Sequence, residues 1–157
     1  AQSAIGQGAI EDLNPDLPGV TQRQRRLNFM SRHPDSYKPM QQQRQRDCIA
    51  ALERNLVVEQ NYIPLQALPV AMPKLRNGDI FALVTDVDGL DVTHVGVVER
   101  VGDQVNGFHA APGHGVIRSV DLARYGRAID NVIGMSFFRP LEATQNKISI
   151  KPASANQ

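Results

Sequence analysis

Two strand-like runs of residues, Val92–Arg100 and Gln104–Ala111, form the centre of the stretch around which the chain is organised, Asn77–Val116. The pair Gly102-Asp103 separates the two runs, and a leading glycine suits a tight two-residue turn. The pattern therefore predicts an antiparallel β-hairpin, with side chains that alternate between its two faces.

Each strand of this predicted hairpin carries a histidine. With a two-residue turn, His94 lies opposite Ala111, and His109 lies opposite Gly96. The two imidazoles then point to the same face as diagonal neighbours, whereas a slip of one residue would turn His109 to the other face. We expect Gly96 to leave room for the histidine ring. Two adjacent imidazoles, one orienting the other, form the base half of a nucleophilic triad.

Upstream of the hairpin, Pro39–Glu59 has a helical pattern. Proline suits the first turn, and apolar side chains recur there at intervals of three and four residues: Cys48, Ile49, Leu52 and Leu56. Prolines at 64, 69 and 73 make Tyr62–Pro73 a connector. Ile10–Val20 is expected to be extended chain with turns, and Leu27–Tyr37 a loop with buried anchors at Phe29 and Met30.

The remaining elements are short. We predict strands and one helical turn in the following order: strand Asp79–Thr85, strand Gly115–Val120, helical turn Asp121–Tyr125 and strand Val132–Arg139. The fold class is therefore α+β, with one N-terminal helix packed on a small antiparallel sheet or half-barrel. The expected organisation is a loose lead-in over 1–9, one domain over 10–140, and a polar, disordered tail over 141–157.

Composition removes several classes of function. The 157 residues carry a net charge of +1, so binding to nucleic acid is not expected, and the basic run Gln22–Arg26 is interpreted as a solvated face. No apolar run approaches the length needed to span a membrane. A single cysteine excludes an intrachain disulfide, and no cofactor is implied.

The two histidines have other interpretations. A lone histidine in an apolar strand is most simply a core residue bonded to a carbonyl, but the second one on the same face favours a site. A metal pair is the competing use of two imidazoles, yet no third ligand is evident, because Asp91 is expected on the other face. His114 is interpreted as an exposed loop residue.

Cys48 is the only candidate thiol nucleophile in the chain. Its place on the apolar stripe with Leu52 and Leu56 predicts a buried, slowly reacting thiol, because apolar surroundings disfavour the thiolate. Activation would require the helix to begin near Asp47, which would expose the sulfur to the helix N-terminus and to His94.

Several motifs carry a resemblance to a known family. NGDIFALVT, GLDVTHVGVV, FHAAPGHGV and the upstream LNFMSRHPDSY resemble the bacterial N-acetylmuramoyl-L-alanine amidase-like family of the NlpC-type, papain-like cysteine peptidases. The similarity runs from about Ile10 to Pro140. It implies a papain-like half-fold, a periplasmic or secreted location, and hydrolysis of muropeptide amide bonds in the cell wall. By this resemblance His94 is the catalytic base and His109 the residue that orients it.

Two departures from the family pattern matter. His109-Ala110-Ala111 replaces the family's His-Ala-Ser, a change that is expected to keep the backbone path. The family's Asp-Cys-Thr-Thr-Phe-like nucleophile motif lies before the segment that matches Ile10, and this chain lacks it. The resemblance thus implies a C-terminal half that is inactive alone and needs an N-terminal segment to supply the cysteine. Two alternatives stay open: a non-catalytic peptidoglycan-binding module, and a cysteine hydrolase that uses Cys48 in its Asp47-Cys48 pair.

Overall fold

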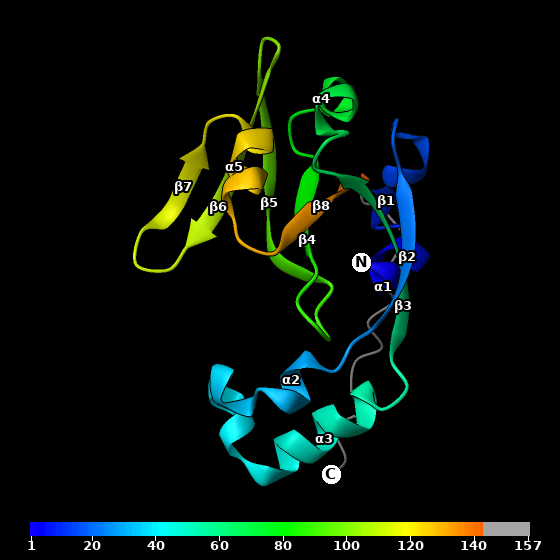
Figure 1. Ribbon diagram of the computed structural model, residues 1–157, viewed down its shortest axis with the longest axis vertical. Helices are drawn as coiled ribbons and strands as arrows, with labels where there is room; N and C mark the ends of the chain where they lie inside the picture. Colours follow the sequence, from blue (N-terminus) through cyan, green and yellow to red (C-terminus); the bar gives the residue numbers. More distant parts are fainter. Residues whose placement is uncertain (143–157) are drawn as a thin grey trace, which may run out of the picture.

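The computed structural model describes residues 1–142 and has an open antiparallel sheet, with the strand order β2-β3-β8-β4-β5-β6-β7 and β1 paired with β8 (Figure 1). The strands of the described chain are β1 (Ile10–Asp12), β2 (Thr21–Arg26), β3 (Val57–Pro64), β4 (Ile80–Thr85), β5 (Val92–Val101), β6 (Gln104–Ala111), β7 (Gly115–Ser119) and β8 (Val132–Pro140). The helices are α1 (Gln2–Gly6), α2 (Phe29–Arg32), α3 (Gln43–Glu53), α4 (Leu68–Ala71) and α5 (Leu122–Ala128). The predicted α+β class is confirmed.

The predicted hairpin of β5 and β6 is confirmed in its register. Val101 pairs with Gln104, and the ladder continues to Val97 opposite Phe108. Gly102 has a φ of 59°, in the left-handed region that glycine adopts without steric cost, which explains its leading place in the turn. The short strand predicted over Gly115–Val120 is present as β7, and it pairs with the free side of β6.

A β-bulge that the sequence did not reveal lies at the start of β5. Leu83 of β4 pairs with His94, whereas the next residue, Val84, pairs with Val92, so Thr93 is an extra residue in β5. A bulge bends its strand and changes the direction of the neighbouring side chains. Here the bulge lies immediately before His94. The side chain of Leu83, the residue of β4 that pairs with His94, lies on the same face of the sheet as the imidazole.

The helix predicted over Pro39–Glu59 is too long at both ends. It begins at Gln43 and ends at Glu53, and Val57–Pro64 forms β3 instead of helix and connector. The carboxylate of Glu53 accepts hydrogen bonds from the amides of Met30 and Ser31, at 3.1 and 2.9 Å, which ties α3 to α2. The β-branched pair that opens β3 favours a strand after this point.

The expectation that the helix predicted over Pro39–Glu59 packs on the sheet is wrong. Helix α3 packs against α2 and a 3₁₀ turn at Lys38–Gln41, and these segments form a lower lobe in Figure 1. Helix α5 is the one that packs on β6 and β8. Phe29 and Met30, predicted to be buried anchors, are only half-buried, because the small lower lobe offers little core.

The basic run Gln22–Arg26 lies in β2 and is not simply a solvated face. Arg23 donates to the carbonyl of Thr85 at 2.9 Å, and Arg25 donates to the carbonyls of Leu90, at 3.2 Å, and Val87. Burial, together with the nearby charge of Arg25, lowers the pKa of Arg23. The two side chains therefore hold the loop over 86–91 that leads into the strand of His94.

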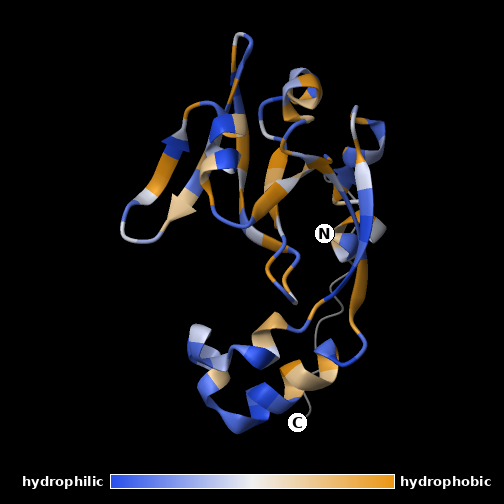
Figure 2. Ribbon diagram, in the orientation of Figure 1, coloured by the Kyte–Doolittle hydropathy of each residue, from blue (hydrophilic) through white to orange (hydrophobic). Residues whose placement is uncertain are grey.

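The core lies between the sheet and the short helices α4 and α5, and Figure 2 shows apolar residues concentrated along β4 and β8. Its fully buried members include Ile63, Leu68, Phe81, Leu83, Leu122, Met135 and Phe137. The site described below lies at the edge of this core.

At the ends of the described chain, α1 occupies part of the predicted lead-in over 1–9. The predicted disorder over 141–157 falls outside the described residues from 143 onward. Within residues 1–142, no helix is both long and apolar enough to cross a bilayer.

Candidate functional site: a histidine pair on the central hairpin

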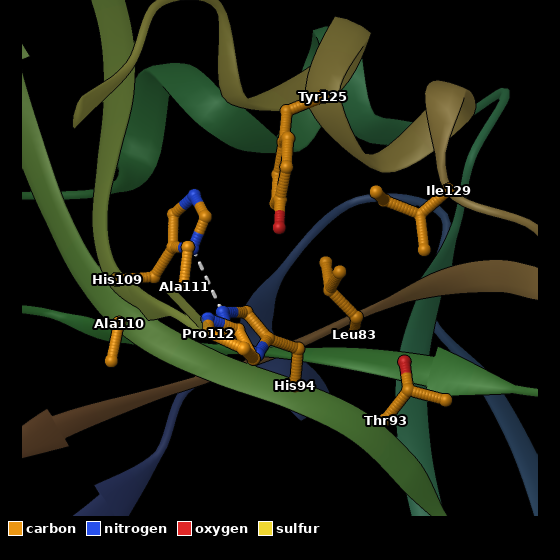
Figure 3. Close-up of a pocket in the computed structure, with 9 residues that line it drawn as sticks. All are labelled: Leu83, Thr93, His94, His109, Ala110, Ala111, Pro112, Tyr125 and Ile129. Carbon is orange, nitrogen blue, oxygen red and sulfur yellow. Dashed lines mark hydrogen bonds between the residues drawn. The ribbon is translucent and has the colours of Figure 1, made fainter. Parts of the chain in front are cut away.

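His94 and His109 are in direct contact across the hairpin (Figure 3). Nε2 of His94 lies 2.8 Å from Nδ1 of His109, and the ring centroids are 4.7 Å apart with the planes nearly perpendicular. The predicted placement of both rings on one face of paired strands is confirmed. A hydrogen bond at this distance allows one imidazole to orient the other.

The second imidazole is held from three sides. His109 is only 5% exposed, and its Nε2 lies 2.8 Å from the hydroxyl oxygen of Ser119 on β7. The ring of Tyr125, from α5, stacks on it at 4.6 Å, and Phe81 of β4 meets it at 6.4 Å with nearly perpendicular ring planes. These contacts restrict the rotation of His109, so its Nδ1 stays directed at His94.

Gly96 was expected to leave room for the ring of His109, but the structure gives another reason for a glycine at this position. A Cβ atom at Gly96 would lie 2.5 Å from Cζ of Phe81 and 2.5 Å from the carbonyl oxygen of Phe108. Glycine therefore makes room for the ring of Phe81, which in turn supports His109, rather than for the histidine directly. Gly107 has the same role on β6, where a Cβ would lie 2.8 Å from Phe81.

The pair borders a small pocket of about 240 Å³. The pocket is lined by Leu83, Thr93, His94, His109, Ala110, Ala111, Pro112, Tyr125 and Ile129. In Figure 3 the hydroxyl of Tyr125 points into this space, beside Leu83 and Ile129. The site therefore combines a mostly apolar wall with an imidazole pair and a phenol, which is typical of a small-molecule pocket.

The surroundings favour the neutral form of His94. Burial lowers its pKa below the ordinary 6.5, and the nearby His109 lowers it further, because two charged imidazoles would repel. Burial also raises the pKa of Tyr125, so its phenol stays protonated. Near neutral pH, His94 is thus an unprotonated imidazole that can accept a proton.

We therefore expect His94 to titrate with a midpoint below 6.5 in the folded protein. Between that midpoint and 6.5 the folded state binds fewer protons than the unfolded state, so stability should rise with pH in this window and fall as the pH is lowered through it. NMR spectra of the ring carbon protons against pH, compared with a histidine in an unstructured peptide, measure the midpoint. A midpoint at or above 6.5 would contradict this.

No metal centre is evident in the part of the chain that the structure describes, where no three His, Cys, Asp or Glu side chains gather suitably for an ion. A side-chain oxygen of Asp91 accepts from the amide of Val92 at 2.9 Å, and His114 is exposed in the turn before β7. Neither residue lines the pocket. The metal interpretation of the pair thus gains no third ligand from residues 1–142.

Cys48 is not brought to the histidine pair. It lies on α3 in the lower lobe, whereas the pocket lies between the hairpin and α5, and it does not line that pocket. The predicted burial is wrong: Cys48 is exposed, and Leu52 is 65% and Leu56 39% exposed. Within residues 1–142, no surface covers this apolar stripe, because α3 packs through other residues, including the buried Glu53, and Leu56 lies beyond the end of the helix.

The exposed Cys48 should react readily with alkylating reagents under native conditions near pH 8, in contrast to the slow labelling that burial would have given. Cys48→Ser should change the free energy of unfolding by less than about 0.5 kcal/mol, because the side chain has few contacts to lose. Mass spectrometry of timed iodoacetamide reactions and urea denaturation measure the two effects. Protection of the thiol until the protein unfolds would show that it is buried after all.

Ser119, Tyr125 and Phe81 were not singled out from the sequence. Ser119 could have been found from register, because Ile117 pairs with His109 and Ser119 lies two residues further on the same face. Tyr125 has no such signal, because its contact with His109 depends on how α5 packs on β6.

The fold and the site together define an α+β protein with a hydrogen-bonded histidine pair at a sheet-borne pocket. A family model described as AmiA-like, N-acetylmuramoyl-L-alanine amidase-like, matches residues 8–132. The chain belongs to this family, which is consistent with the resemblance seen in the sequence. No curated protein matches the chain significantly.

Solved structures agree with this assignment. An N-acetylmuramoyl-L-alanine amidase from Bacteroides uniformis is 25% identical to this chain, with a TM-score of 0.79. The match covers 88% of this chain and 60% of the amidase chain. A Bacteroides fragilis protein provisionally described as a xylanase is 29% identical with a TM-score of 0.77, covering 88% and 62%. A Legionella pneumophila protein shares the fold, with 17% identity and a TM-score of 0.66. The match covers 89% of this chain and 59% of the Legionella chain. The chain thus spans about three fifths of the length of these structures.

Proposed function

We propose that the His94–His109 pair is the proton-transfer half of an amidase site that cleaves amide bonds in peptidoglycan fragments. The observation that carries this proposal is the 2.8 Å contact between Nε2 of His94 and Nδ1 of His109, with His109 buried and His94 bordering the pocket. In this arrangement His109 orients His94 and leaves Nδ1 of His94 directed away from the pair. Membership of an amidase-like family supports the choice of bond.

In the proposed reaction His94 is the general base and then the general acid. Nδ1 of His94 takes the proton of a thiol as the sulfur attacks the amide carbonyl, and gives it to the departing amine. Water, activated by the same nitrogen, then hydrolyses the thioester. The lowered pKa of His94 supports this role, because the imidazole is unprotonated near neutral pH.

The nucleophile in this proposal is a cysteine of a segment outside residues 1–157, as in the NlpC-type peptidases that the sequence resembles. Cys48 is unsuited to the role, because it is exposed in the lower lobe and does not line the pocket. If peptidoglycan is the substrate, the protein works in the periplasm or outside the cell, which is the location we propose.

Glycoside hydrolysis, suggested by the description of one similar structure, fits this site less well. Most glycosidases flank the scissile bond with two carboxyl groups. None of the residues that line the pocket carries one, and the pair present consists of imidazoles.

The test is hydrolysis of purified muropeptides, measured as newly released amino groups. Residues 1–157 alone should show negligible turnover, and turnover should appear when a segment carrying the family's Asp-Cys motif precedes them in one chain. In that longer chain, His94→Ala should lower the rate by about 10²–10⁴-fold or more. His33→Ala, which alters an exposed histidine of the lower lobe, serves as the matched control and should retain the rate.

Three outcomes would overturn the proposal. Muropeptide binding without cleavage by the longer chain would indicate a binding module. Cleavage by residues 1–157 that is lost in Cys48→Ala would assign the nucleophile to Cys48. Unchanged cleavage in His94→Ala would remove the histidine pair from the reaction.

A further inference from the structure

We infer that Ser119 is a positioning residue, which fixes the nitrogen of His109 that carries the proton and thereby leaves Nδ1 of His94 free to act as a base. The geometry is a chain of two hydrogen bonds, from Nε2 of His94 to Nδ1 of His109 and from Nε2 of His109 to the hydroxyl of Ser119, each 2.8 Å long. Ser119 is thus the outer end of a three-residue relay that begins at the pocket.

Two proton orders are compatible with these distances when both rings are neutral. In the first, His94 donates from Nε2 to His109, and His109 donates from its own Nε2 to Ser119. In the second, Ser119 donates to His109, His109 donates from Nδ1 to His94, and Nδ1 of His94 carries a proton. Only the first order leaves a lone pair on Nδ1 of His94, which a general base needs. Our choice of the first order therefore rests on the proposed function.

Ser119 supplies the acceptor that the first order needs. His109 is 5% exposed, stacked on Tyr125 and met by Phe81, so its ring is not free to turn toward another partner. Among residues 1–142, Ser119 is the one side chain that hydrogen bonds Nε2 of His109. The hydroxyl can accept from Nε2–H or donate to an unprotonated Nε2. Without it, however, a buried Nε2–H would have no acceptor, which is costly, so the form that leaves Nδ1 of His94 free depends on Ser119.

A hydroxyl also orients the pair without adding charge. A carboxylate at the same place would favour the protonated imidazoles and raise their pKa values. The lowered pKa of His94 agrees with a neutral acceptor at the end of the relay.

Nitrogen-15 NMR of the folded full chain at pH 8, which distinguishes protonated from unprotonated ring nitrogens, tests the inference. In the unaltered protein both rings should carry their proton on Nε2. In Ser119→Ala the ratio of the Nε2–H to the Nδ1–H form of His109 should fall about fivefold, and His94 should shift in the same direction. Ser119→Thr, which keeps the hydroxyl, should retain the original ratio.

Ser136→Ala is the matched control, because Ser136 is a strand serine that donates to the carbonyl of Asn61, away from the pair. It should leave both histidines unchanged. A His109 protonated on Nδ1 in the unaltered protein, or tautomers unaffected by Ser119→Ala, would overturn the inference. Because the readout is the position of a proton and not turnover, this failure is distinguishable from failure of the proposed amidase function.

Discussion

Phe81→Ala should lower the free energy of unfolding by about 3–5 kcal/mol, one of the two largest effects expected for a single substitution in this protein. Phe81 is fully buried at the centre of the core, and both Gly96 and Gly107 lack a side chain where its ring lies. Truncation removes the ring and leaves a cavity that those two glycines cannot fill. Urea denaturation followed by circular dichroism measures the change.

The same substitution should also loosen His109, because the edge-on contact at 6.4 Å is lost. Phe108→Ala is the matched control: Phe108 lies on β6, which β5 separates from the strand of Phe81, and it is 38% exposed, so its loss should cost clearly less. Equal losses for the two variants would show that Phe81 is not the centre of the core.

Asp79→Ala should destabilise the protein by about 3–5 kcal/mol through the loss of a buried ion pair. Asp79 is 1% exposed and binds Arg139 of β8 through two hydrogen bonds of 2.8 Å, while it also accepts the amide of Arg76 at 2.7 Å. Its removal leaves a half-buried guanidinium and a backbone donor unpaired. The hydrogen bond from Arg139 to Asp79 raises the pKa of that guanidinium in the unaltered protein. Without Asp79 the guanidinium still keeps its charge, because arginine is not deprotonated in proteins.

Asp88→Ala is the appropriate comparison, because its ion pair with Arg32 is at the surface and Asp88 is 82% exposed. Exposed ion pairs contribute little to stability, so Asp88→Ala should change the free energy of unfolding by no more than about 1 kcal/mol. Chemical denaturation of both variants at the same pH gives the two values. A cost of Asp79→Ala no larger than that of Asp88→Ala would refute the importance of the buried pair.

Phe81 also supports the histidine pair directly, because its ring meets that of His109 at 6.4 Å. Phe81 is on β4, the strand that pairs with β5, and Asp79 immediately precedes it. On the other side of His94, Arg23 and Arg25 hold the ends of the loop over 86–91 by donating to the carbonyls of Thr85 and Leu90. The imidazoles are thus fixed by elements from distant parts of the sequence.

The sequence by itself determined the features that depend on local pattern. A glycine-led turn between two strand-like runs sets the hairpin register, and that register alone places His94 and His109 on one face. The α+β class likewise follows from the order of short apolar segments. The family motifs lie in the same stretches, so the resemblance was also a property of local sequence.

Only the tertiary structure decided the rest, because those features depend on contacts between segments far apart in the chain. The apolar spacing of Cys48, Leu52 and Leu56 predicted burial, but burial requires a facing surface, and none of the described residues 1–142 provides one there. Tyr125 reaches His109 only through the packing of α5 on β6. The bulge at Thr93 arises from the pairing of β4 with β5, so no alternation within β5 alone could reveal it.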